Sequence, residues 1–230
     1  MRVALEEQLT LAQATLQEEC SLVLRMLRAA LKALEEWDVD LADEVIDYDD
    51  QVDERYLRVD QLVEEVVALQ APTARDMRLV LAISKVNLHI ERMADYCVTV
   101  AKLTKLSAKL PNDMRMVAWL EEMGARAEEM IQVSINAFAA RDAVAAESLI
   151  GLDELIDRAN RKAVDWVVEI GSDPEKREWA ARMLIVSRCL ERIGDHAVPF
   201  QRARVFTGVV PASVKPPPAS RSPLGRTSRS

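Results

Sequence analysis

Residues 38–53, DVDLADEVIDYDDQVD, have a counterpart 104 positions later in residues 142–157, DAVAAESLIGLDELID. The spacing of apolar residues predicts a helix in both segments, yet each segment carries aspartates in its interior. Aspartate is a poor helix former, so helix propensity alone does not place it at matching positions of two helices. The matched interior aspartates are Asp49 with Asp153 and Asp53 with Asp157. This match indicates that the two segments are copies of one unit.

A second match joins residues 90–98, IERMADYCV, to residues 190–198, LERIGDHAV, at an offset of 100 positions. Together the two matches predict an internal repeat of about a hundred residues. Chance similarity between amphipathic helices is the alternative, but it does not account for the shared aspartates.

The composition is typical of a helical bundle. The 230 residues include only six Gly and nine Pro, half are hydrophobic, and 4% are aromatic. Pro72, Pro111 and Pro174 divide long stretches in which apolar residues recur every three or four positions, and Asp38 and Asp142 are good helix N-caps. The predicted fold is all-α, with two tandem pseudo-symmetric three-helix bundles made of six long antiparallel helices. The predicted helices span residues 4–37, 39–70, 73–106, 112–140, 143–170 and 174–206.

The predicted helices divide the chain into a first bundle (1–106), a second bundle (107–206) and a tail (207–230). The tail holds five of the nine prolines, four basic residues and no acidic ones, so it is predicted to be disordered. The net charge of the whole chain is -8, so the folded part is more acidic still. An acidic body disfavours nucleic acid as a direct partner.

Cys20, Cys97 and Cys189 lie far apart and form no CxxC motif, which indicates neither a disulfide framework nor a thiolate metal site. The first residues lack the character of a signal peptide, and no apolar run reaches the roughly 18 residues needed to cross a bilayer. A soluble cytoplasmic protein is expected.

Each unit contains two pairs of carboxylates spaced four residues apart, so the members of a pair share one helix face. In antiparallel hairpins the pairs of the first unit lie at equal height, and those of the second unit nearly so. Two unit charges about 5.5 Å apart repel by roughly 3 kcal/mol at an effective dielectric constant of about 20, and a multivalent cation removes that repulsion. The candidate metal ligands are Asp49, Asp53, Glu91, Asp95, Asp153, Asp157, Glu191 and Asp195.

Oxygen ligands without a histidine in register suit hard cations, namely Mg, Mn, Ca or ferric iron. The alternative is that the pairs form solvated helix faces, on which Arg92 and Arg192 partly neutralise Asp95 and Asp195. A helical wheel places Glu91 and Asp95 away from the apolar stripe, at the edge of the bundle or outside it. The repetition of the pairs and their equal height favour metal.

Three segments, LQAPTARDMR, IERMAD and CLERIGDHA, resemble signatures of the PhoU family of phosphate-uptake regulators, and the resemblance covers roughly residues 5–206. It implies two three-helix bundles related by pseudo-symmetry, with E/D-x-x-x-D motifs that hold metal ions, in some members as clusters of iron or zinc. The eight carboxylates are thereby expected to bind Mg, Mn, Fe or Zn.

The same resemblance implies a non-catalytic, cytoplasmic negative regulator of phosphate uptake and of the phosphate-starvation response. Such a protein connects a phosphate ABC transporter to a sensor histidine kinase, and lies at the membrane only through these partners. A homo-oligomer, as a dimer, is also expected, because metal-bearing acidic faces can bridge subunits as easily as partners.

Some features depart from the family pattern. Pro199 predicts a kink just after the last motif, and Gly151, two residues before Asp153, predicts a looser second site. The tail is not part of the pattern.

Two other classes of protein compete with this interpretation. A ferritin-like, carboxylate-bridged di-metal oxidoreductase is also a helical bundle, but it needs Glu-x-x-His, which is absent. His89 and His196 are interpreted as surface or packing residues, and no motif for nucleophilic catalysis is present. A non-catalytic helical scaffold explains the apolar stripes but leaves the matched acidic pairs unexplained.

Overall fold

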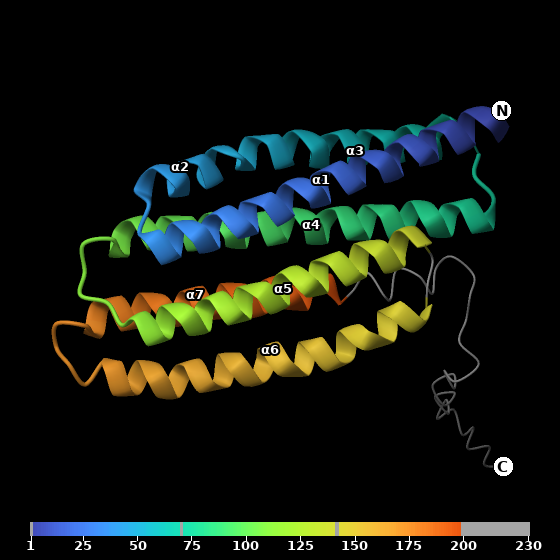
Figure 1. Cartoon of the computed structure of the whole chain (residues 1–230). Helices are drawn as coiled ribbons and strands as arrows, with labels where there is room; N and C mark the ends of the chain where they lie inside the picture. The colour runs from blue at the N-terminus through green and yellow to red at the C-terminus, as the bar shows by residue number, and fades with distance from the viewer. Residues whose placement is uncertain (1, 70, 141–142, 199–230) are drawn as a thin grey trace, which may run out of the picture.

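The computed structural model describes residues 2–69, 71–140 and 143–198 of the chain. These residues form an elongated molecule in which long helices run side by side (Figure 1). The first repeat is made of α1 to α4 and the second of α5 to α7. The bounds of the helices are α1 (Arg2–Glu36), α2 (Val39–Asp47), α3 (Asp49–Leu69), α4 (Ala74–Ser107), α5 (Met114–Ala140), α6 (Ala143–Ile170) and α7 (Arg177–Ala197).

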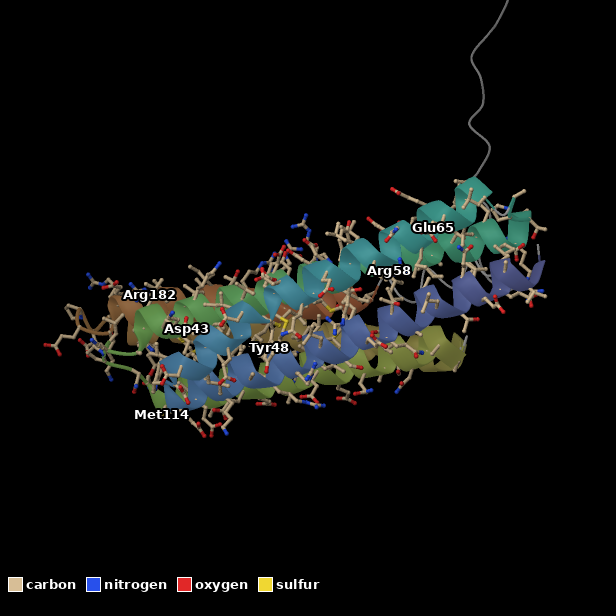
Figure 2. The ribbon with its side chains drawn as sticks, turned by 90° about the horizontal axis from the view of Figure 1, so that it is seen from above. Asp43, Tyr48, Arg58, Glu65, Met114 and Arg182 are labelled. Atoms are coloured by element: carbon tan, nitrogen blue, oxygen red, sulfur yellow. The ribbon has the colours of Figure 1, made fainter. Side chains whose placement is uncertain are left out.

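The predicted helix 39–70 is interrupted at Tyr48, which separates α2 from α3 (Figure 2). Tyr48 keeps a helical backbone and its N–H donates to the Glu44 carbonyl at 3.1 Å, so α3 continues the course of α2. Aspartates flank the break, and their short polar side chains compete with the backbone for hydrogen bonds. The Arg25 guanidinium of α1 lies 6.0 Å from the centre of the Tyr48 ring. The six-helix plan is thus confirmed, with its second helix in two pieces.

Capping residues fix where two of the helices begin. Asp38 starts α2, because its Oδ1 accepts a hydrogen bond from the Leu41 N–H at 2.9 Å, as predicted. Trp37, just before it, has a φ of 56°, a left-handed conformation that ends α1. At the start of α4 the Thr73 N–H donates to Asp76 Oδ2 at 3.1 Å, which forms half of a capping box.

A continuous hydrophobic core runs through both repeats. α1 packs against α3 and α4, while α5, α6 and α7 pack against one another. The repeats meet where α4 contacts α7 and where α1 contacts α5. Each fully buried large side chain stabilises the fold by about 1.5–3 kcal/mol relative to an exposed one. Fully buried examples are Leu27, Ile83, Met93, Met123 and Met183.

α1 and α5 pack closely at Gly124. A Cβ atom at this position would lie 2.4 Å from Leu31 Cδ1 of α1, closer than two carbon atoms can approach. The glycine therefore permits this contact between the two repeats, although glycine is unfavourable within a helix.

The later helices follow their predicted ranges, with small shifts at the ends. α7 begins three residues after Pro174, because residues 173–176 form a turn in which the Lys176 N–H donates to the Asp173 carbonyl at 3.2 Å. The predicted kink at Pro199, the predicted helix beyond residue 198 and the predicted disorder of 207–230 lie outside the described residues. Among the described residues, every helix is too short or too polar to cross a membrane.

Candidate metal centres

The first group of predicted ligands comes together where α3 lies beside α4. Burial, followed by the negative charges of Asp53 and Asp95, raises the pKa of Asp49. The pKa of Glu91 is raised by burial first, and then by Asp95, Asp53 and Asp49. Because the charges of Asp53 and Asp95 act on both Asp49 and Glu91, the four carboxyls lie in one cluster. We call this set, Asp49, Asp53, Glu91 and Asp95, the first carboxylate cluster.

The second group comes together in the same way between α6 and α7. Burial, and then the charges of Asp157 and Asp195, raises the pKa of Asp153. Burial also raises the pKa of Glu191, with smaller contributions in the same direction from Asp195 and Asp157. The second carboxylate cluster is therefore Asp153, Asp157, Glu191 and Asp195. The pairs meet in each repeat, as the predicted equal height requires.

Both clusters lie at the edge of the bundle, where part of each carboxylate reaches solvent. The side chain of Glu91 is 22% exposed and that of Asp95 is 45% exposed. This agrees with the placement from the helical wheel. The second cluster contains a more enclosed member, since the Glu191 side chain is only 10% exposed.

Arginines pair with several of these carboxylates. Arg92 Nη1 donates to Asp95 Oδ2 at 3.0 Å, and Arg192 Nη1 donates to Asp195 Oδ2 at the same distance. Arg188 also donates to Glu191 Oε2. These ion pairs are partly exposed, so each contributes at most about 1 kcal/mol. They neutralise part of each cluster, as the solvated-face alternative expects, but leave other carboxylate oxygens unpaired.

One buried carboxylate oxygen in each cluster has no hydrogen-bond partner within the chain. In the first cluster it is Glu91 Oε2 and in the second it is Asp153 Oδ1. A buried polar atom without a hydrogen bond is unfavourable, so both atoms could accept a cation, although Arg92 Nε already lies 3.4 Å from Glu91 Oε2. Within residues 2–69, 71–140 and 143–198, however, no three His, Cys, Asp or Glu side chains converge closely enough to form a ready-made cage for a metal. The carboxylates are gathered, but a cation would have to draw them closer.

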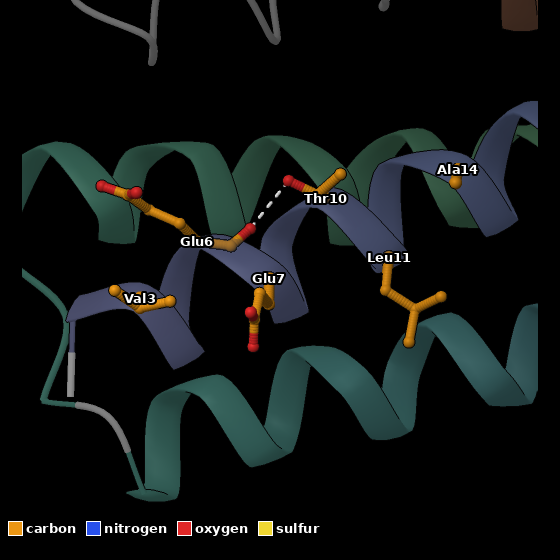
Figure 3. A pocket seen from close by; sticks show the side chains of 6 residues that line it. All are labelled: Val3, Glu6, Glu7, Thr10, Leu11 and Ala14. Carbon is orange, nitrogen blue, oxygen red and sulfur yellow. Dashed lines mark hydrogen bonds between the residues drawn. The ribbon is translucent and has the colours of Figure 1, made fainter.

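A hollow of about 300 Å³ lies directly beside the first cluster. Its lining combines the carboxylates of Asp49 and Asp95 with the cations of Arg92 and Lys102. Another pocket, of about 450 Å³, is lined by the N-terminal half of α1 alone (Figure 3). The Thr10 hydroxyl in that pocket donates to the Glu6 carbonyl of its own helix at 2.7 Å, so no polar groups from different elements converge there.

One carboxylate beside the first cluster was missed in the sequence analysis. Glu19 of α1 is completely buried, and neither of its carboxylate oxygens has a hydrogen-bond partner. Burial, and to a smaller extent the charge of Glu91, raises the pKa of Glu19 to about 9. A signal was present, because Glu19 falls in line with the apolar residues Leu16 and Val23.

The two histidines face each other where α4 of the first repeat packs against α7 of the second. His89 Nδ1 and His196 Nδ1 are 2.9 Å apart, and Tyr96 lies beside His196 with ring centres 5.7 Å apart. Burial lowers the pKa of both histidines. They pack between the repeats, which agrees with their interpretation as packing residues. Cys97 and Cys189 are also buried, and burial raises the pKa of both thiols.

The fold and the clusters define an all-helical protein of two pseudo-symmetric repeats, each carrying an acidic cluster at a matching position. The PhoU domain matches residues 16–104 and 120–200, one match in each repeat. The chain therefore belongs to the PhoU family.

Individual relatives agree with this assignment. The chain is 35% identical over 200 residues to a phosphate-specific transport system accessory protein PhoU homolog of Deinococcus radiodurans, covering 85% of this chain and 92% of the relative. A homolog of the same description from Pseudomonas aeruginosa is 30% identical over 177 residues, covering 76% of this chain and 73% of the relative. The relatives' names describe accessory proteins, which agrees with the expectation that this chain is not an enzyme.

Solved structures show the same architecture. The crystal structure of PhoU from Pseudomonas aeruginosa superposes with a TM-score of 0.82 at 28% identity, covering 88% of this chain and 97% of that one. A structure described as the phosphate transport system regulatory protein PhoU from Streptococcus pneumoniae gives a TM-score of 0.79 at 23% identity, covering 88% of this chain and 96% of that one. The second likeness supports the fold alone.

Proposed function

We propose that this protein is a negative regulator of phosphate uptake and of the phosphate-starvation response, acting as a metal-binding adaptor between a phosphate ABC transporter and a sensor histidine kinase. It works in the cytoplasm and reaches the membrane through these partners. Membership of the PhoU family and the names of its relatives support the link to phosphate transport. The single structural observation that carries the proposal is the pair of carboxylate clusters at matching positions of the two repeats.

The residues of both clusters fit a multivalent cation. They offer oxygen donors only, and the buried atoms Glu91 Oε2 and Asp153 Oδ1 accept no hydrogen bond. Oxygen donors suit Mg, Mn, Ca or ferric iron better than zinc, which favours nitrogen and sulfur ligands. When bound, the cation supplies a fixed positive charge on the acidic helix faces. Such a face can contact a partner protein or a second copy of the chain, so a homo-dimer belongs to the same proposal.

The metal-binding part is tested by removing one pair of carboxylates at a time. We expect Asp49→Asn/Asp53→Asn to lose the cation of the first cluster, and Asp153→Asn/Asp157→Asn to lose that of the second. The readout is metal content by mass spectrometry after dialysis against MnCl2. The matched control is Asp40→Asn/Glu44→Gln, because this pair has the same four-residue spacing but lies exposed on α2. Equal metal content in all variants would overturn the proposal for the clusters.

The regulatory part is tested by deleting the gene and assaying phosphate-starvation genes in phosphate-rich medium. We expect constitutive expression, restored to repression by the unchanged gene and by the Asp40→Asn/Glu44→Gln control. The cluster variants are expected to restore it less well. Normal repression in the deletion strain would defeat the regulatory proposal.

A further inference from the structure

Glu19 occupies a position that a carboxylate rarely takes. It lies on the side of α1 that packs against α3 and α4, and its side chain has no exposed surface. Both oxygens, Oε1 and Oε2, lack a hydrogen-bond partner within the chain. An unpaired buried carboxyl group is unfavourable for folding, so its presence calls for a compensating interaction.

The surroundings of Glu19 place it beside the first carboxylate cluster. The charged groups that influence it are Glu91 of α4, followed by Arg55, Asp60 and Asp53 of α3. These charges belong to α3 and α4, the two helices against which this side of α1 packs, so Glu19 lies near both. The one cation in this set, Arg55, makes no hydrogen bond to Glu19: its Nη1 donates to the Gln51 carbonyl, and its buried Nε has no hydrogen-bond partner.

Glu91 presents the matching group from the other side. Its Oε2 is also buried and accepts no hydrogen bond, with Arg92 Nε at 3.4 Å as its ion-pair partner, and Glu91 is the charged residue that acts most strongly on Glu19. Three buried carboxylate oxygens from two helices thus lie in one region and accept no hydrogen bond, although Arg92 lies beside one of them. Hard cations take six to eight oxygen ligands, and buried carboxylate oxygens are among those they prefer.

The second repeat shows that the fold does not need a carboxylate at this place. At the offset of 104 positions, Glu19 corresponds to Met123 of α5. Met123 is fully buried, and its sulfur accepts a contact from the Ser187 hydroxyl at 3.5 Å. An uncharged methionine fills the equivalent site, so the packing of α1 does not explain Glu19.

We propose that Glu19 is a metal ligand supplied by α1, which joins Glu91 in holding a cation between α1, α3 and α4. The inference rests on the metal-binding part of the proposed function. It adds a third helix to the first site and makes the two sites unequal. The first site is closed from the inside by α1, whereas the second has no carboxylate on the corresponding helix face.

The test measures Mn2+ binding by the full chain in the Asp153→Asn/Asp157→Asn background, where only the first site remains. Binding is followed by isothermal titration calorimetry and by the electron paramagnetic resonance signal of free Mn2+. Glu19→Met, which copies the second repeat, and Glu19→Gln are compared with Glu18→Gln. Glu18 is the exposed neighbour on α1, so its replacement removes the same charge without reaching the site.

We expect both Glu19 variants to weaken Mn2+ binding about tenfold or more, because even groups that only support a ligand contribute that much. Glu18→Gln should change it less than about twofold, in line with a screened surface charge. Circular dichroism verifies that the variants fold. Equal affinities of the Glu19 and Glu18 variants would overturn the ligand role and leave the metal-binding proposal intact. A parent protein that binds no Mn2+ with both sites unchanged would overturn both.

Discussion

Replacing Glu19 with glutamine should stabilise the metal-free protein at neutral pH. Glutamine has nearly the same shape as glutamic acid, so the packing between α1, α3 and α4 is retained. The change removes a group whose ionised form the folded protein disfavours, since burial and the charge of Glu91 raise the pKa of Glu19 from its ordinary value of 4.5 to about 9.

The magnitude follows from the linkage between proton binding and folding. Between pH 4.5 and 9 the folded chain keeps the Glu19 proton while the unfolded chain releases it, so the free energy of unfolding falls as pH rises. The fall is about 1.4 kcal/mol per pH unit, which gives about 3 kcal/mol at pH 7. Glutamine lacks this dependence. It leaves a polar amide in the same buried place, so the gain is confined to the ionisation effect.

The assay is urea unfolding followed by circular dichroism, with EDTA present, at several values between pH 5 and pH 8. The stability difference between Glu19→Gln and the unchanged chain should be small at pH 5 and should grow by about 3 kcal/mol by pH 7. Glu18→Gln is the control and should show no such trend. A difference that stays constant across this range would refute the reasoning, because it would mean that Glu19 does not carry its proton in the folded state.

Three further predictions concern other parts of the fold. Gly124→Ala should lower the free energy of unfolding by on the order of 1 kcal/mol, and with it the melting temperature, because the added Cβ would meet Leu31 of α1. Gly151→Ala should raise the free energy of unfolding by about 0.5–1 kcal/mol, because nothing lies within 4 Å of the added Cβ. Because the pKa values of His89 and His196 are lowered in the folded protein, the two histidines add to the free energy of unfolding above their ordinary pKa of 6.5, and this contribution is lost as pH falls below it. In urea unfolding between pH 5 and pH 7, His89→Gln should therefore lose less stability toward acid than the unchanged chain. Asp38→Ala should cost about 1 kcal/mol in the same assay, because the first turn of α2 loses its cap.

The repeat and the helix ends could be predicted from the sequence because both depend on local chemistry. Apolar spacing of three and four residues marks the helices, and Asp38 caps α2 where its side chain can reach the first turn. The meeting of the carboxylate pairs was also predictable. In two antiparallel helices joined by a short turn, residues that are equally far from the turn along the chain lie side by side.

Other features depend on contacts between distant parts of the chain. The contact of Arg25 of α1 with the Tyr48 ring joins residues that no local pattern brings together, although the aspartates beside the break were visible in the sequence. Glu19 is the clearest case. The sequence shows only a carboxylate within an apolar stripe, and its complete burial becomes evident from the packing of α1 against α3 and α4.

The internal repeat separates what folding requires from what it does not. Both repeats must solve the same packing problem, so a difference in polarity between matched buried positions cannot be a demand of the fold. The second repeat places Met123 where the first has Glu19, and Ser187, which donates to Asn160, where the first has Asn87. The Asn87 side-chain oxygen and both oxygens of Glu19 are buried without partners, whereas the Ser187 hydroxyl is satisfied. The unsatisfied polar groups inside the first repeat are therefore an addition to a fold that is stable without them. An interaction from outside the chain is the compensation that such an addition requires.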